Sequence, residues 1–207
     1  MPHNPKEQHA KELFELLESL TPYIEEKVEL YALGGTALTL LGIKPSTLDI
    51  DVNIHSEKQY KYLCQIFQKI GFKRIGTIRW QTQEGIAFDL FHGSNILGTQ
   101  LLSDCLEQST LIKTIGNISL YTLSLYDIII SKLARGDERD FIDIKHIFEY
   151  QKIDLEKLVT RYQQTMELSV VAQHKQKLLD LIEIKFIQWK YELNNKIIQE
   201  VRQWPEH

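Results

Sequence analysis

The stretch Leu33-Gly34-Gly35-Thr36, followed by Thr47-Leu48-Asp49-Ile50-Asp51, decides how this sequence folds. An apolar run from Val28 leads directly into the two glycines, which predicts a strand that turns into a short helix. Asp49 and Asp51 alternate with apolar residues, so on a second strand both carboxylates project from one face. Two charges held side by side need a cation, and Mg²⁺ is usually bound by one or two carboxylates with phosphates and waters. The pattern therefore predicts a metal site beside a turn.

A third acid lies in another apolar run, where Ile86-Ala87-Phe88 and Leu90-Phe91 flank Asp89. An acid in so apolar a strand either faces solvent or has a cation partner. Given the pair at Asp49 and Asp51, we expect Asp89 to share their cation.

The glycine turn has two readings. Gly34 and Gly35 before a helix would let a phosphate approach the backbone N–H groups and the positive end of the helix dipole, and Thr36 would add a hydroxyl. Taken on their own, two glycines before a helix more often form only a tight turn without a ligand. The carboxylates that follow favour phosphate binding.

Bulk composition is that of a globular protein, with 207 residues, 43% hydrophobic residues, 25% charged residues and a net charge of −4. This charge gives no overall attraction to nucleic acid or membrane. Cys64 and Cys105 lack metal or disulfide spacing, which favours a reducing compartment. The polar N-terminus and the lack of a long apolar run predict a cytoplasmic protein that neither is exported nor spans a membrane.

Periodicity predicts an α+β fold, with a mixed central sheet flanked by helices and followed by a C-terminal helical region. We expect a core with an N-terminal helix over residues 1–123 and helices over 124–207. Expected helices cover residues 5–29 with a break at Thr21-Pro22, 36–41, 56–70, 98–108, 125–135, 138–150 and 172–204. Expected strands cover residues 28–33, 48–54, 72–78, 79–83, 86–91 and 118–123.

The last expected helix, 172–204, is longer than a small sheet domain needs to cover itself. Part of it would then meet a partner chain, as a homodimer or a heteromer. A helix packed wholly on its own domain, or kinked at Asn194-Asn195, explains the same pattern.

Basic residues occur in two further places. Lys61, Lys69, Lys73, Arg74 and Arg79 with Trp80 would suit an RNA backbone, although a solvated helix and strand face explains them equally. Lys132 precedes Arg139-Asp140-Phe141-Ile142-Asp143. Lys132 also suits a helix C-terminus and Asp140 a first turn, and Asp143 is expected to form an ion pair that orients Lys132 or Arg139.

The ordered set of motifs over residues 28–150 resembles the nucleotidyltransferase fold typified by DNA polymerase β, and within it minimal prokaryotic members such as the AbiEii-type toxins. The matching pieces are Gly34-Gly35-Thr36-Ala37-Leu38, then Lys44 and Thr47, then Asp49-Ile50-Asp51, then Asp89, and finally Lys132 and the Arg139 helix. Lys44 stands where many relatives have arginine, and a lysine keeps the charge but loses the bidentate fork.

The resemblance implies a role for each matched residue. Asp49 and Asp51 would hold the metal that bridges a nucleoside triphosphate (NTP), and Asp89 would complete a second metal site and take the proton of the acceptor hydroxyl. Two Mg²⁺ ions, or Mn²⁺ in their place, would be the cofactors. The implied nucleotide-binding residues are Gly34, Gly35, Thr36, Lys44, Thr47, Lys132 and Arg139.

The implied function is a metal-dependent nucleotidyltransferase that moves a nucleoside monophosphate (NMP) from an NTP to a hydroxyl of RNA, such as tRNA, or of a partner protein. The setting would be a toxin-antitoxin or phage-defence system. The alternative is a non-catalytic binding module of the same fold, acting as an antitoxin or regulator. A phosphatase or nuclease is less favoured, because the sequence shows no cluster of His and Asp typical of their metal sites.

Overall fold

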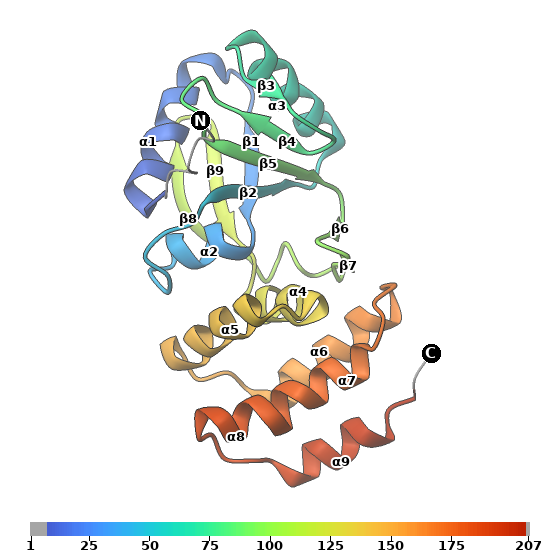
Figure 1. Cartoon of the computed structure of the whole chain (residues 1–207). Coiled ribbons are helices and arrows are strands. Elements are labelled where there is room, and N and C mark those ends of the chain that lie inside the picture. The colour runs from blue at the N-terminus through green and yellow to red at the C-terminus, as the bar shows by residue number, and fades with distance from the viewer. Residues whose placement is uncertain (1–7, 206–207) are drawn as a thin grey trace. The chain divides into compact units, whose positions relative to one another are not determined.

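The computed structural model describes residues 8–205 (Figure 1). The chain divides into two compact units. Unit 1 comprises the chain up to residue 96 together with residues 103–124, and unit 2 comprises residues 97–102 and the chain from residue 125 onward. Within the described residues, no helix combines the length and the apolar character needed to cross a membrane.

Unit 1 is built on a mixed sheet of seven strands in the order β3-β4-β5-β2-β1-β9-β8. The strands are β1 (Val28–Ala32), β2 (Asp49–Ile54), β3 (Lys73–Arg74), β4 (Arg79–Gln81), β5 (Ala87–His92), β8 (Thr110–Ile115) and β9 (Ile118–Thr122). Strand β1 is parallel to β9 and antiparallel to β2, whereas β2 is parallel to β5. Strands β3, β4 and β5 are successive antiparallel neighbours. The predicted α+β class with a mixed sheet is confirmed.

The N-terminal helix ends earlier than its apolar stripe. Helix α1 (Ala10–Leu20) is followed by the 3₁₀ turn η1 (Thr21–Tyr23). Pro22 lacks a backbone N–H and cannot continue an α-helix, so the predicted break is confirmed. The expected first residues of this helix, 5–7, lie outside the described part of the chain.

Helix α3 (Glu57–Lys69) packs against β1, β2 and β3. It begins at Ser56, whose hydroxyl accepts a hydrogen bond from the backbone N–H of Gln59, as the predicted N-cap requires. Phe67 on this helix meets Trp80 and Phe88 of the sheet edge to edge, with ring centroids 5.5 and 5.0 Å away. This aromatic cluster fixes β4 and β5 beneath the helix.

The helix expected over residues 98–108 is wrong, and the strand that follows it was not predicted. Residues 98–108 form the short strand β7 (Thr99–Gln100) and turns rather than a helix, and β6 (Asn95–Ile96) precedes them. Leu97 and Gly98 both have positive φ, which interrupts a helical path. Strand β8 is not predicted by the sequence because most of its side chains are exposed and it shows no apolar alternation. It forms through antiparallel pairing with β9.

Unit 2 is helical apart from β7. Its helices are α4 (Leu125–Arg135), α5 (Glu138–Tyr150), α6 (Leu155–Glu167), α7 (His174–Leu179), the π-helical segment η2 (Asp180–Lys185), α8 (Phe186–Trp189) and α9 (Asn195–Gln203). Helices α5, α6 and α7 all contact α4, and α9 contacts α7. Buried aliphatic residues at helical spacing, including Ile129, Leu133 and Ile144, form the core between them. The predicted bounds of α4 and α5 are confirmed.

The single helix expected over residues 172–204 is wrong. Helix α8 ends at Lys190, which has a positive φ of 63°, and α9 begins anew at Asn194, whose side chain accepts from the N–H of Ile197. The alternative of a break at Asn194-Asn195 is confirmed. Because the helix is interrupted, its length no longer argues for a partner chain.

Candidate active site

Strands β2 and β5 bring the three aspartates together on unit 1. Asp51 stands opposite Asp89 in the parallel register of β2 and β5, and Asp49 stands opposite Ala87. Because residues in register on adjacent strands project to the same face of a sheet, the three carboxylates share one face. The side chain of Asp89 is 11% exposed and that of Asp49 is 38% exposed, so the group lies at the edge of the core.

The glycine elbow touches this acidic group. Helix α2 (Gly34–Leu40) begins at Gly34 itself, two residues earlier than expected. The N–H of Leu33 donates to the carbonyl of Asp51 at 3.0 Å, which ties the elbow to β2. Gly34 has a φ of +47°, and a Cβ on it would lie 3.5 Å from Oδ2 of Asp51. The bare backbone therefore leaves open space against that carboxylate.

Gly35 and Thr47 meet closely. A Cβ on Gly35 would stand 2.8 Å from Oγ1 of Thr47, which is too short for a real contact. The hydroxyl of Thr47 donates to the carbonyl of Asp49, and its backbone pairs with Gln8. Gly35 is thus required by the packing of the loop before β2.

Thr36 uses its hydroxyl as both donor and acceptor. Oγ1 donates to the carbonyl of Asp49 at 3.1 Å and accepts from the N–H of Asp51 at 2.9 Å. Thr36 is 2% exposed. These contacts give Thr36 the role of holding α2 against the Asp-x-Asp strand, and its predicted role in phosphate binding stays a prediction.

Arg79 is the site residue that the sequence did not single out. It stands directly opposite Asp89 in the antiparallel register of β4 and β5. Its Nε and Nη2 donate to Oδ1 and Oδ2 of Asp89, each at 2.7 Å, and Nη2 also reaches Oδ2 of Asp49 at 3.1 Å. The sequence pattern groups Arg79 with a basic stretch that fits either an RNA backbone or a solvated face. The hairpin spacing between β4 and β5 was the available signal, because it aligns Arg79 with Asp89.

The neighbouring Trp80 points to the opposite side and is fully buried, so it offers no stacking surface to RNA. Arg74 bonds to the carbonyls of Gly76 and Thr77. Of this stretch, Trp80 therefore lies in the core, Arg79 in the candidate site and Arg74 on the surface.

Electrostatics in the group are dominated by Arg79. Hydrogen bonds from its guanidinium to Asp89 raise the pKa of Arg79 above its ordinary range, against the opposing effect of burial. Asp49 and Asp51 suit a single divalent ion, because both present oxygen atoms on one face beside the bare backbone of Gly34. Both oxygens of Asp89 accept from Arg79, and binding of a second ion by Asp89 stays a prediction. Over residues 8–205, no group of three His, Cys, Asp or Glu side chains is arranged as a metal site.

The remaining predicted nucleotide-binding residues lie in different places. Lys44 is half-buried in the loop between α2 and β2. Lys132 is 2% exposed on α4, and its Nζ donates to Asp143 at 2.6 Å and to Asp140 at 3.4 Å. The ion pair expected for Asp143 is therefore present. Arg139 is exposed at the start of α5. Nucleotide contact by these three residues stays a prediction.

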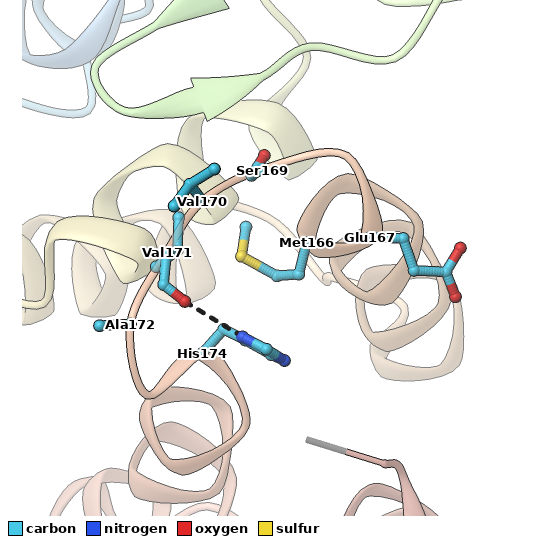
Figure 2. A pocket seen from close by; sticks show the side chains of 7 residues that line it. All are labelled: Met166, Glu167, Ser169, Val170, Val171, Ala172 and His174. Atoms are coloured by element: carbon cyan, nitrogen blue, oxygen red, sulfur yellow. Dashed lines mark hydrogen bonds between the residues drawn. The ribbon is translucent and has the colours of Figure 1, made fainter. Parts of the chain in front are cut away.

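Unit 2 also contains a cavity of about 510 Å³ (Figure 2). Its wall is mostly apolar, and the ring of His174 is held by a 3.1 Å hydrogen bond between Nδ1 and the carbonyl of Val171. The residues around it are Met166, Glu167, Ser169, Val170, Val171, Ala172 and His174. With one carboxylate and no lysine or arginine, this wall has no charge pattern suited to a triphosphate.

A mixed sheet with a glycine elbow beside an Asp-x-Asp strand and a third aspartate on the adjacent strand is the arrangement of the nucleotidyltransferase fold. The family model described as "Nucleotidyltransferase of unknown function (DUF6036)" matches residues 8–196, and the chain belongs to this family. None of the curated proteins matches the sequence.

Two solved structures are similar to this chain. An antigenic nucleotidyltransferase-like protein from Paracoccidioides brasiliensis superposes with a TM-score of 0.51 at 13% identity, covering 93% of this chain and 97% of its own. A Thermotoga maritima protein provisionally described as a nucleotidyltransferase gives a TM-score of 0.45 at 17% identity, covering 72% of this chain and 100% of its own. At these identities the first likeness supports the fold alone.

Proposed function

We propose that this protein transfers an NMP from an NTP to an acceptor hydroxyl and releases pyrophosphate. The acceptor oxygen bonds to the α-phosphorus, the bond from that phosphorus to the oxygen leading to the β-phosphate breaks, and the hydroxyl proton passes to a carboxylate or to water. The observation that carries the proposal is the register of β2 and β5, which sets Asp51 beside Asp89 and keeps Asp49 on the same face.

The chain's own residues prepare the site in three ways. The missing side chain of Gly34 lets phosphate oxygens approach the backbone next to Asp51. Thr36 fixes the distance between that elbow and β2 through its two hydrogen bonds. A divalent ion held by Asp49 and Asp51, Mg²⁺ or Mn²⁺, would supply neutralisation of the phosphate charge.

Label transfer tests this proposal. The full chain is incubated with each α-labelled NTP, Mg²⁺, and either total RNA or cell lysate, beside Asp49→Asn/Asp51→Asn. We expect labelled acceptor with the wild type and a loss of at least about a hundredfold in the variant, as for removal of charge stabilisation at a reacting phosphate. Glu84→Gln, which neutralises an exposed carboxylate on a turn of the same unit, is the matched control and should keep full activity. Equal labelling by wild type and the double variant would refute the assignment.

The resemblance to AbiEii-type toxins extends the proposal to a toxin-antitoxin or phage-defence setting, with RNA such as tRNA or a partner protein as acceptor. Ribonuclease or protease treatment of the labelled product identifies which class of acceptor carries the NMP. Expression of the wild type in a bacterial host should arrest growth, and expression of Asp49→Asn/Asp51→Asn should not.

Docking of a second copy or a partner on helices α7 to α9 stays a prediction.

One observation favours the alternative of a non-catalytic binding module. Arg79 already forms ion pairs with both Asp49 and Asp89. A scaffold that no longer binds nucleotide would be stable in this form. Failure to label any acceptor, together with no binding of NTP in the presence of Mg²⁺, would support this second function.

A further inference from the structure

Arg79, Asp89 and Asp51 form a row across three adjacent strands. Arg79 is in register with Asp89 between β4 and β5, and Asp89 is in register with Asp51 between β5 and β2. Such a row places all three side chains on one face of the sheet. The backbone pairing, and not a flexible side chain alone, therefore brings the guanidinium to the acidic group.

The contacts of Arg79 use the geometry that distinguishes arginine from lysine. Two donors meet the two oxygens of Asp89 as a fork at 2.7 Å each, and the same Nη2 reaches Asp49 at 3.1 Å. A fork of this kind fixes the orientation of the carboxylate as well as its charge. Asp89 is 11% exposed, so an unpaired charge there would be costly.

A second divalent ion has no place at Asp89 in this arrangement. Mg²⁺ needs carboxylate oxygens at about 2.0–2.1 Å in octahedral geometry, yet both oxygens of Asp89 accept short hydrogen bonds. An ion there would also bring two positive charges against the guanidinium. Arg79 supplies the positive charge that a second ion would otherwise provide to Asp89.

We propose that Arg79 replaces the second metal ion of this site, so that the protein binds one divalent ion, on Asp49 and Asp51, and uses Asp89 to hold Arg79. This proposal rests on the proposed function, which assigns a divalent ion to Asp49 and Asp51. Arg79 is here a positioning residue, which keeps Asp49 and Asp89 together and lowers their mutual repulsion. This use of Asp89 competes with its predicted use as a ligand of a second ion.

Mn²⁺ binding by the full chain, measured by the electron paramagnetic resonance signal of free Mn²⁺, tests this without any assay of activity. We expect one ion per wild-type chain and two per chain of Arg79→Met, because loss of the guanidinium releases Asp89. Arg74→Met removes the same charge from the neighbouring strand β3 and should still bind one ion. Two ions on the wild type, no ion on the wild type, or no second ion on a folded Arg79→Met would each overturn the proposal.

A second variant covers the case in which Arg79→Met does not fold because Asp89 is left as an unpaired charge. Arg79→Met/Asp89→Asn removes both partners, and we expect it to bind one ion with an affinity within about threefold of the wild type or tighter, since neither residue ligates that ion. Weaker binding would show that Asp89 is a ligand and would refute the proposal. One bound ion without NMP transfer would refute the proposed function alone, and two bound ions with transfer would refute the role of Arg79 alone.

Discussion

Asp51 and Asp89 face each other in register across the parallel strands β2 and β5. The two residues lie far apart along the chain, and the parallel pairing of β2 with β5 brings them side by side. Asp89 can lie in the apolar strand β5 because Arg79 is its cation partner.

Thr36→Val should destabilise the protein by about 1–3 kcal/mol, because it removes the acceptor of the part-buried N–H of Asp51. Urea unfolding followed by circular dichroism measures the change. Thr39→Val on the same helix is the matched control. Oγ1 of Thr39 is buried and, among the described residues, has no hydrogen-bond partner, so its loss should be neutral or stabilising. An equal loss of stability in both variants would contradict the assigned role of Thr36.

Gly35→Ala should destabilise unit 1 by about 1–3 kcal/mol, because the new Cβ would stand 2.8 Å from Oγ1 of Thr47. Thr47→Ala removes that hydroxyl, so the cost of Gly35→Ala should be smaller in its background. A double-mutant cycle of unfolding free energies measures this coupling. Gly76→Ala, where a Cβ would meet nothing within 4 Å, serves as the control. Simple additivity of Gly35→Ala and Thr47→Ala would argue against the contact.

Lys132→Met should destabilise the chain by about 3–5 kcal/mol, because it leaves Asp143 and Asp140 as buried carboxylates with one cation fewer. Lys145→Met, which breaks an exposed pair with Glu149, should change stability by no more than about 0.5 kcal/mol. Denaturant unfolding of both variants gives the comparison. Reduced NTP affinity in Lys132→Met with unchanged stability would instead identify Lys132 as a phosphate contact.

The stability contributed by Asp140 should disappear in acid. Burial raises the pKa of this carboxyl, but hydrogen bonds and charge from Arg135 and Lys132 outweigh it and leave the pKa below its ordinary value of 3.8. A lowered pKa in the folded state gives stability that is complete above the unfolded pKa and is lost as pH falls through the folded one.

The difference in unfolding free energy between wild type and Asp140→Asn should therefore be largest above about pH 5 and should shrink below about pH 4. Chemical unfolding at a series of pH values measures it. A difference that stays constant from pH 7 to about pH 2 would show that Asp140 is not the titrating group.

Much of unit 1 could be predicted because its signals are local. The break at Pro22, the cap at Ser56 and the two carboxylates of the Asp-x-Asp strand depend on residues within a few positions of one another. Strand β8 could not be predicted, since its exposed residues are ordered by pairing with β9. The break near Lys190 has a different cause: the apolar spacing on both sides of it fits one continuous helix, so spacing alone does not show where the helix ends.

By itself, the sequence determined the α+β class, the glycine elbow and the acidic strand, since strand alternation and glycine conformations are properties of adjacent residues. Only the tertiary structure decided that Arg79 is the cation between Asp49 and Asp89. That outcome needs β4 and β5 to pair in one particular register, and register is set by the packing of buried residues such as Trp80 and Phe88 on one face of the sheet.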